Sequence, residues 1–391
     1  MKPKELKQQR VTLFRDAASL RRPARVPHLA NAVTWKIFNA GHTLPEAMQS
    51  FDVMRECVVH FLDRYPVDAL IDCGIRNQFN VTDAFDREHS YYYYTEETVG
   101  IRDHAHCTLE TLSDYLADPE RYLWERALPA KYPDWNEKPL SAFQQAFDEY
   151  LRYTMFIIKM GTLTGGTYGL PGMSPNNPMK GAITFGIEEL LANLLGIRGL
   201  SVGMRRDPGR IQAFIEEWDE KNIRPAIARL LAGKDGPDMK YCFDSSLMML
   251  AQNILNNRQF EAYYWPSLRP LLDAYAQKRK NVRIFVEGSM ERFYDYFADL
   301  PKGVVTLHLE RDDPFEVRKR LPNVAIMGGM TSAMLSDATP DACVAHAKRL
   351  IDELGRDGGF ILSEDKMLSC RNDARAENFK AVCDFVNGYW L

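Results

Sequence analysis

The last third of the chain alternates short apolar runs with segments of helix length, and this pattern constrains the fold most. The apolar runs, rich in β-branched residues, lie at 281–288, 303–310, 323–330 and 358–363. The helix-length segments lie at 289–300, 313–321 and 339–355. Alternating strands and helices are typical of a parallel α/β sheet. Because these units follow one another closely and further strands are expected upstream, the sequence favours a closed, TIM-like (β/α)8 barrel over an open sheet.

Two further strands and one capped helix are predicted upstream. Residues 25–30 and 68–73 are short apolar runs of strand length. Thr43 stands where a helix N-cap is expected, because Pro45 follows in the first turn and Glu46 comes three residues later. We expect this helix to end near residue 64, before the next predicted strand.

The middle of the chain lacks this alternation of strands and helices. Region 74–150 is rich in tyrosine, histidine and charge without a strand–helix repeat, which predicts inserted loops and helices. Segment 161–182 holds six glycines and three prolines, which predicts a long loop that forms the wall or lid of a pocket. Helices are expected over 183–232. A turn at 233–238 and a further helical stretch should then lead to residues 263–266.

The first residues form a basic segment. We expect residues 1–24 to be an N-terminal extension built as a charged helix, with a docking surface for an acidic partner as the alternative. A single barrel domain is expected over 25–391. The segment lacks the apolar core of a secretory signal, and no run approaches the length of a membrane span, so we expect no membrane association.

The amino-acid composition limits which kinds of partner and which cellular compartment we expect for this protein. Of 391 residues, 46% are hydrophobic and 26% charged, which is enough for a sizeable core and excludes a disordered or fibrous chain. A net charge of −4 offers no general basic field, so we expect no nucleic-acid partner. The seven cysteines are odd in number and lack CxxC spacing, which fits a reducing compartment, and we expect the cytoplasm.

Charged side chains close two of the predicted strands. In a TIM barrel the active site lies at the carboxyl ends of the strands. Glu287 ends one strand and shares a face with Phe285, and His308 and Glu310 share a face at the end of the next strand. Burying an unpaired carboxylate is costly, so each acid needs a partner or a function. We take Glu287, His308 and Glu310 as candidate catalytic residues. The alternatives are structural ion pairs of the two acids with nearby arginines and, for His308, a satisfied histidine of the core.

Four further positions are candidates for binding a substrate. Asp72 ends another predicted strand, and Gly328 ends a strand where a missing side chain would let the backbone approach a ligand. Tyr94 would share a strand face with Tyr92 and line an aromatic pocket, although plain packing would explain both. Tyr168 lies on the glycine-rich segment that we expect to close over that pocket.

Several motifs together resemble the uroporphyrinogen decarboxylase superfamily. Residues 25–48, RVPHLANAVTWKIFNAGHTLPEAM, are similar to its opening strand and turn, and residues 68–73, DALIDC, to its second strand. Later motifs match in order and spacing within 258–391: RQFEAYYWPSLRPLL, IFVEGSMERFYDYFADLP, VAIMGGM, GGFILS and AENFKAVCDFV. The superfamily also contains corrinoid-dependent methyltransferases. The resemblance implies a TIM-like barrel, and it suggests a homodimer because members are often dimers.

The chain departs from two branches of this superfamily. The decarboxylases carry arginines in the opening loop that hold substrate carboxylates, whereas the matching stretch 37–42 has none, which argues against uroporphyrinogen as the substrate. Thiol-methylating members bind zinc through His-x-Cys and a later cysteine. The matching positions hold Phe285 and Glu287 and, later, fall near Lys366, so we expect no thiolate-type zinc site. The cluster at 104–107, His-Ala-His-Cys, leaves the question of another metal open.

With this resemblance, the chain is expected to be a methyltransferase. A small-molecule methyl donor, such as an aryl methyl ether, would pass its methyl group to a corrinoid (cobalamin) carried by a separate corrinoid protein. Glu287 would protonate the leaving oxygen, and His308 or Glu310 would orient or reload it. Asn39 and His42, polar residues of the opening loop, join the candidate substrate-binding set. A decarboxylase of a small aromatic acid and a non-catalytic tetrapyrrole- or corrinoid-binding module remain alternatives.

Overall fold

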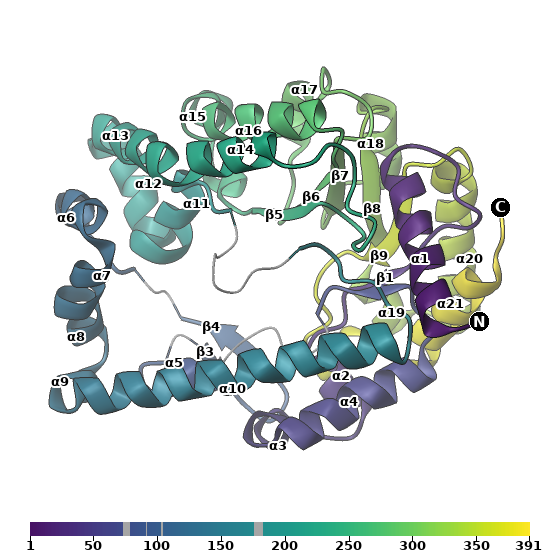
Figure 1. The fold of residues 1–391 in the computed structure, drawn as a ribbon, viewed down its shortest axis with the longest axis horizontal. Coiled ribbons are helices and arrows are strands. Elements are labelled where there is room, and N and C mark those ends of the chain that lie inside the picture. The colour runs from purple at the N-terminus through teal and green to yellow at the C-terminus, as the bar shows by residue number, and fades with distance from the viewer. Residues whose placement is uncertain (73–78, 91, 103–104, 176–182) are drawn as a thin grey trace.

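Short parallel strands form the wall of an α/β, TIM-like barrel (Figure 1). The computed structural model describes the chain apart from residues 73–78, 91, 103–104 and 176–182. A five-stranded parallel sheet has the order β5 (Ser245–Met249), β6 (Val282–Val286), β7 (Val305–Leu309), β8 (Ala325–Met330) and β9 (Phe360–Glu364). A parallel bridge between His28 and Leu362 brings β1 (Leu29–Ala30) beside β9, and β1 pairs in parallel with β2 (Ala69–Leu70).

Extended residues 172–173 continue the wall beyond β5. The amide N of Cys242 donates to the carbonyl O of Gly172 at 3.0 Å, and that of Phe243 donates to Met173 at 2.8 Å. The wall therefore runs from β2 through β1 and β9 round to this segment. Ala69, from one end, belongs to the apolar cluster that fills the interior, and Met173, from the other end, packs against this cluster. This shared interior makes the sheet a barrel rather than an open layer.

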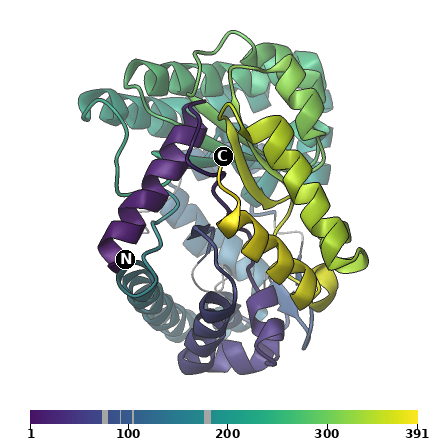
Figure 2. The same cartoon turned by 90° about the vertical axis from the view of Figure 1, so that its right-hand side faces the viewer.

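Helix α1 (Pro3–Ala18) covers the amino-terminal end of the barrel (Figure 2). Its buried Phe14 packs in the interior cluster with Phe243, and the two rings meet edge to face with centroids 6.1 Å apart. Arg15 is buried and forms an ion pair with Asp244 at 2.7 Å. The basic segment 1–24 thus contributes a helix that packs on the barrel, and one of its positive charges, that of Arg15, is neutralised by an acid of the barrel.

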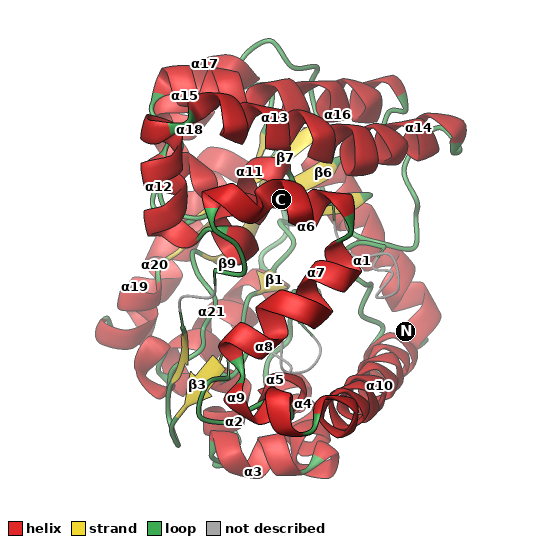
Figure 3. Cartoon of the chain, turned by 90° about the vertical axis from the view of Figure 1, so that its left-hand side faces the viewer, coloured by secondary structure: helices red, strands yellow, loops and turns green. Residues whose placement is uncertain are grey.

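Helices surround the wall and fill the inserted region (Figures 1 and 3). Besides α1 they are α2 (Trp35–Asn39), α3 (Leu44–Gln49), α4 (Phe51–Arg64), α5 (Phe79–Asp83), α6 (Leu112–Ala117), α7 (Pro119–Tyr122), α8 (Leu128–Lys131), α9 (Pro133–Glu137), α10 (Pro139–Gly166), α11 (Gly186–Glu189), α12 (Gly196–Arg206), α13 (Pro208–Trp218), α14 (Arg224–Ala232), α15 (Asn257–Tyr263), α16 (Trp265–Gln277), α17 (Tyr294–Phe297), α18 (Pro314–Arg320), α19 (Ser332–Asp337), α20 (Pro340–Leu350) and α21 (Ala376–Gly388). The inserted region also holds an antiparallel hairpin of β3 (Tyr92–Tyr94) and β4 (Val99–Ile101). Across the described ranges, no helix is long and apolar enough to cross a membrane.

The predicted strands and the predicted helix start are confirmed with shorter bounds. The strands expected in the last third correspond to β6 through β9, and those expected upstream to β1 and β2. The capping box of Thr43 and Glu46 is present: each side chain bonds the other residue's backbone N–H. The helix that they start is interrupted, because Ser50 is extended and accepts a hydrogen bond from Val53 as the N-cap of α4.

Two expectations in the middle of the chain are wrong. The long loop expected over 161–182 begins only after Gly166, since residues 161–166 are the last turns of α10. The helical stretch expected before residues 263–266 contains strand β5 instead. Its sequence, SSLMM, has no β-branched residue, and pairing with β6 along its whole length is what makes it a strand.

Candidate functional site

The carboxyl ends of β6 and β7 bring the predicted acids together at the mouth of the barrel. Phe285 lies opposite His308 in the parallel register, and the ring centroids are 5.1 Å apart. Two residues further along each strand lie Glu287 and Glu310, on the same interior face as alternation requires. Partial desolvation in the mouth of the barrel, followed by the charge of Glu310, raises the pKa of Glu287, although the residue stays exposed to solvent. The two carboxyl groups are therefore close enough to influence each other, as the sequence pattern predicts.

The backbone around Glu287 is held in one place by side-chain hydrogen bonds. Its carbonyl oxygen accepts from Gln252 at 2.5 Å and from Asn253 at 2.8 Å. The next residue, Gly288, has a φ of +71°, and a Cβ there would lie 2.2 Å from the Asn253 side chain. The Gly288 amide donates to the carboxyl of Glu310. The glycine thus allows a tight turn that fixes Glu310 beside Glu287.

Glu188, on α11, is a site residue that the sequence analysis missed. Its carboxyl is buried and accepts hydrogen bonds from the backbone N–H of Leu250 at 2.8 Å and Ala251 at 3.1 Å, and from the Tyr264 hydroxyl at 2.8 Å. Burial raises its pKa to about 7, and the charge of Glu287 adds to the rise. The only local signal is an acid pair inside the apolar run FGIEELL. Three carboxyl groups consequently gather at the ends of β5, β6 and β7.

His308 is a neutral, fully satisfied histidine within the barrel. Arg283 donates to its Nδ1, and its Nε2 lies 2.9 Å from the carbonyl oxygen of Glu364 on β9. Burial, followed by the charge of Arg283, lowers the pKa of His308 well below its ordinary value. Both ring nitrogens are used in these contacts and neither bonds to Glu287. The expected role of His308 in orienting or reloading that acid is therefore not supported by its geometry.

The structural ion pairs considered for the acids are also absent from the described part of the chain. Arg283 donates to His308 and to the Ser246 hydroxyl, the latter at 2.9 Å, and no ion pair joins it to Glu287. Glu310 likewise has no ion-pair partner among the described residues. Glu310 is instead held by the Gly288 amide, and Glu287 is exposed at the mouth, so neither acid depends on an ion pair.

Gly328 packs against the neighbouring strand β7, and this packing accounts for the glycine without a ligand. It has a φ of +128°, and a Cβ there would lie 3.0 Å from the carbonyl oxygen of Leu309 and 3.8 Å from the His308 ring. The space beside this glycine is thus already occupied by β7. Because Gly328 has no side chain, the imidazole ring of His308 can extend across β8 to the carbonyl oxygen of Glu364 on β9.

Asp72 lies at the carboxyl end of β2, the same end of the barrel as Glu287. Its carbonyl oxygen accepts a hydrogen bond from the Nζ of Lys36 at 2.6 Å, and Lys36 is almost completely buried. Lys36 was not among the candidate residues. Its ammonium group lies near the end of β2, where it adds a positive charge to an otherwise acidic mouth.

The structure does not bring Tyr168 or the opening-loop residues to these strand ends. The Tyr168 hydroxyl donates to Asp63 at 2.6 Å and its carbonyl accepts from Arg10 of α1, at the amino-terminal end of the barrel. Asn39 accepts from the Tyr65 hydroxyl at 3.0 Å in the helical layer. His42 lies 3.7 Å from carboxyl oxygens of both Glu46 and Glu56 on the neighbouring helices.

Tyr94 lies on the hairpin and shares a face with Tyr92, as alternation predicts. Both are partly buried against the main core, whereas Tyr93 between them is exposed. The Tyr94 hydroxyl donates to Asp83 at 3.3 Å, and burial raises its pKa. These contacts account for Tyr94 by packing, the alternative raised from the sequence.

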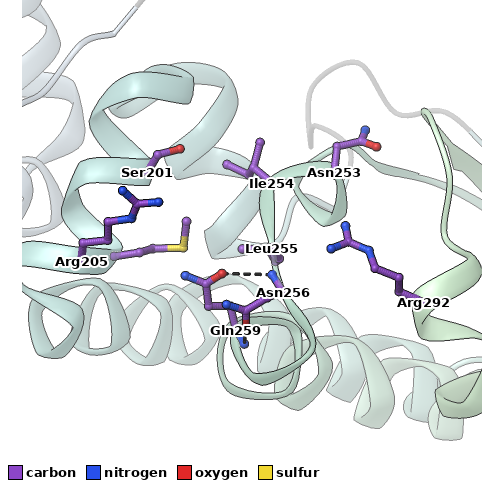
Figure 4. Close-up of a pocket in the computed structure, with 9 residues that line it drawn as sticks. Ser201, Arg205, Asn253, Ile254, Leu255, Asn256, Gln259 and Arg292 are labelled. Atoms are coloured by element: carbon purple, nitrogen blue, oxygen red, sulfur yellow. Dashed lines mark hydrogen bonds between the residues drawn. The ribbon is translucent and has the colours of Figure 1, made fainter.

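A polar cavity of about 290 Å3 shares Asn253 with the acidic site (Figure 4). It lies between α12, the segment after β5 and the start of α15. It is lined by Ser201, Met204, Arg205, Asn253, Ile254, Leu255, Asn256, Gln259 and Arg292. None of the tyrosines expected to line a pocket takes part in this one.

No metal centre is found among the described residues. Within them, no three His, Cys, Asp or Glu side chains are grouped so that they could hold an ion. Of the cluster considered at 104–107, residue 104 lies outside the described residues, while the His106 and Cys107 amides donate to the backbone carbonyls of Asn193 and Leu194.

Comparison with known proteins yields a family match and a shared fold. The sequence model of the family described as Uroporphyrinogen decarboxylase (URO-D) matches residues 185–389, slightly more than half of the chain. No curated protein sequence matches it. A solved methyltransferase from Methanosarcina mazei is similar in structure, with a TM-score of 0.58, 15% identity, and coverage of 96% of this chain and 98% of that one. At this identity the likeness establishes the fold.

Proposed function

The chain belongs to the uroporphyrinogen decarboxylase family, and we propose that it is an enzyme that transfers a methyl group from a small methylated compound. The family and the fold shared with a methyltransferase fit methyl transfer and decarboxylation alike. The observation that supports an acid-assisted reaction is Glu287 at the barrel mouth, beside the fixed carboxyl of Glu310 and with a raised pKa. It would serve either reaction, and the fold shared with a methyltransferase is the reason that methyl transfer comes first. A methyl ether needs such a proton donor, because an alkoxide or phenoxide is a poor leaving group.

Glu287 would act as the general acid. The carboxyl is kept protonated at higher pH than an ordinary glutamate, and its backbone is fixed by Gln252 and Asn253. As the bond between the methyl carbon and the ether oxygen breaks, the electron pair stays on the oxygen, and Glu287 supplies the proton. The resulting carboxylate would then be reprotonated from solvent, since Glu287 is exposed at the mouth.

A neighbouring acid, Glu310, would tune Glu287 rather than touch the substrate. Glu310 is held by the Gly288 amide, so its negative charge stays close to Glu287 and opposes its ionisation. Glu188, with a pKa raised to about 7, lies behind the same strand ends. Phe285, one step deeper in the barrel, provides an apolar surface on which an aromatic ring could rest.

The methyl acceptor in this proposal is a reduced corrinoid carried by a separate protein, and the donor is an aryl methyl ether. We assign the reaction to a reducing compartment such as the cytoplasm, because a reduced corrinoid is oxidised easily. The cysteines support this assignment: Cys57, Cys107, Cys242, Cys343, Cys370 and Cys383 are all free thiols.

Decarboxylation of a small aromatic acid is the second candidate. Glu287 in its acid form would deliver a proton to the carbanion left after loss of CO2, and Lys36 near the end of β2 offers a positive charge for a carboxylate. This alternative uses the same residues, so only products distinguish it.

The two candidates are separated by supplying purified protein with a panel of methoxylated aromatic compounds and the corresponding aromatic acids. With a reduced corrinoid protein present, methyl transfer predicts a change in the corrinoid absorption spectrum together with release of the phenol. Decarboxylation predicts CO2 release that needs no corrinoid. Absence of corrinoid methylation across the panel, with CO2 released from an acid, would contradict the methyl-transfer proposal.

A further inference from the structure

The outer face of helix α10 carries a continuous apolar stripe. The helix lies along one edge of the molecule (Figures 1 and 3). Its inner face packs on the rest of the protein through Ala142, Ala146, Phe156, Met160 and Thr164. On its outer face six large apolar side chains are 44–73% exposed: Leu140, Phe143, Phe147, Leu151, Met155 and Ile158. We call these six residues the α10 stripe.

The spacing of the stripe matches one side of an α-helix. Leu140, Phe147, Leu151 and Ile158 recur at intervals of seven, four and seven residues, which places them on one line parallel to the helix axis. At 1.5 Å per residue this line is about 27 Å long. Phe143 flanks it and stacks on Phe147 with ring centroids 6.3 Å apart. The stripe is thus an ordered surface rather than scattered exposed residues.

We propose that the α10 stripe binds the same stripe of a second copy of this chain, with the two helices antiparallel about a two-fold axis near Leu151. Five of its six residues are arranged nearly symmetrically about Leu151: Phe147 and Met155 lie four residues to either side, and Phe143 and Ile158 lie eight and seven residues away. In an antiparallel pair, Phe147 therefore meets Met155 of the second copy, and Leu151 meets Leu151. A closed, self-complementary contact of this kind is what a symmetric dimer requires.

Charges beside the stripe favour the antiparallel arrangement. Asp148 and Arg152 are both exposed and lie four residues apart on the same flank of α10. A two-fold axis perpendicular to the helices brings the same flank of both copies together. With the axis at Leu151, the position opposite Arg152 of one copy is two residues from Asp148 of the other. A parallel pair related by a two-fold axis along the helices brings opposite flanks together, so Asp148 and Arg152 would not face each other across the contact. The in-chain contact of Arg152 with Glu149, at 3.1 Å, is compatible with either.

The area of the stripe also fits a second copy. Six large apolar side chains, each about half exposed, present roughly 600 Å2, since side chains of this kind cover on the order of 150–250 Å2 when fully buried. A symmetric pair would bury about 1,200 Å2, the lower end of the range for specific interfaces. A membrane surface is a poorer fit because it attracts helices whose polar face is rich in Lys and Arg. Here Asp148 and Glu149 accompany Arg152 and Lys159.

The test measures the mass of the full-length protein in solution by light scattering and sedimentation over a wide range of concentration. The native chain should be a dimer. Leu151→Glu should weaken dimerisation at least about 100-fold, because it sets two carboxylates face to face at the axis. The melting temperature of the monomer should stay unchanged, since Leu151 is exposed there. Gln145→Glu, with the same charge change on an exposed position off the stripe, should leave the dimer intact.

A charge exchange tests the register. Asp148→Arg and Arg152→Asp should each weaken the dimer, and both changes in one chain should restore it. A native chain that is monomeric at every concentration, or a dimer that survives Leu151→Glu, would overturn the proposal. Failure of the double variant to recover would overturn the antiparallel register.

Discussion

Replacing Glu188 by glutamine should change how the stability of the protein depends on pH. Burial raises the pKa of Glu188 from 4.5 to about 7. In the unfolded chain the group ionises near pH 4.5, while in the folded chain it stays protonated until about pH 7. The wild type therefore loses stability as pH rises through this window, by about 3 kcal/mol in total at about 1.4 kcal/mol per unit of pKa. Glutamine cannot ionise, so Glu188→Gln should escape this loss.

The assay compares urea unfolding of the wild type and Glu188→Gln at about pH 5 and about pH 8. Relative to the wild type, the variant should gain about 2–3 kcal/mol between these two values, whatever constant offset the amide itself introduces. Glu120→Gln, which removes an exposed acid, serves as the control and should follow the wild type. A difference between Glu188→Gln and the wild type that stays constant with pH would refute the assignment of a raised pKa to Glu188.

Three further substitutions test other parts of the structure. His308→Leu should lower the free energy of unfolding by about 2–4 kcal/mol, because Arg283 and a β9 carbonyl lose a buried partner; a melting temperature equal to the wild type would argue against these contacts. Gly328→Ala should lower the melting temperature more than Gly41→Ala does, since both glycines have positive φ but only the first Cβ would press on the β7 backbone. Tyr168→Phe should lower the free energy of unfolding by at most about 1 kcal/mol and leave turnover unchanged, because its hydroxyl makes one hydrogen bond at the far end of the barrel. A large loss of turnover would show that Tyr168 takes part in the reaction.

The barrel could be predicted from the sequence wherever a strand carries its own local signal. Strands β6 to β9 are rich in apolar and β-branched residues, so their pattern is visible without any tertiary information. Strand β5 has no such signal and forms only because β6 offers a parallel partner along its length. The full length of α10 could not be predicted from the sequence either. Gly161, Gly165 and Gly166 favour a loop, but they lie in a helix that packs on the barrel.

The candidate site was predictable to the extent that strand alternation governs it. Alternation sets Glu287 on the interior face, and neighbouring parallel strands bring Glu310 beside it. Glu188 could not be found this way, because its partners are backbone amides at Leu250 and Ala251, more than sixty residues later. His308 was predicted on the correct face, but its contact with Arg283 depends on side-chain packing that no local pattern specifies.

The most direct test of the proposed function compares methyl transfer by the wild type and Glu287→Gln in the same preparations used for melting curves. The glutamine keeps the size of the side chain, Glu287 has no ion-pair partner among the described residues, and its pKa is raised, so the melting temperature should not fall. The rate of methyl transfer from an aryl methyl ether to the corrinoid protein should fall by about 10²–10⁴, the usual contribution of a positioned general acid. An unchanged rate in a folded variant would contradict the assignment of Glu287 as the proton donor.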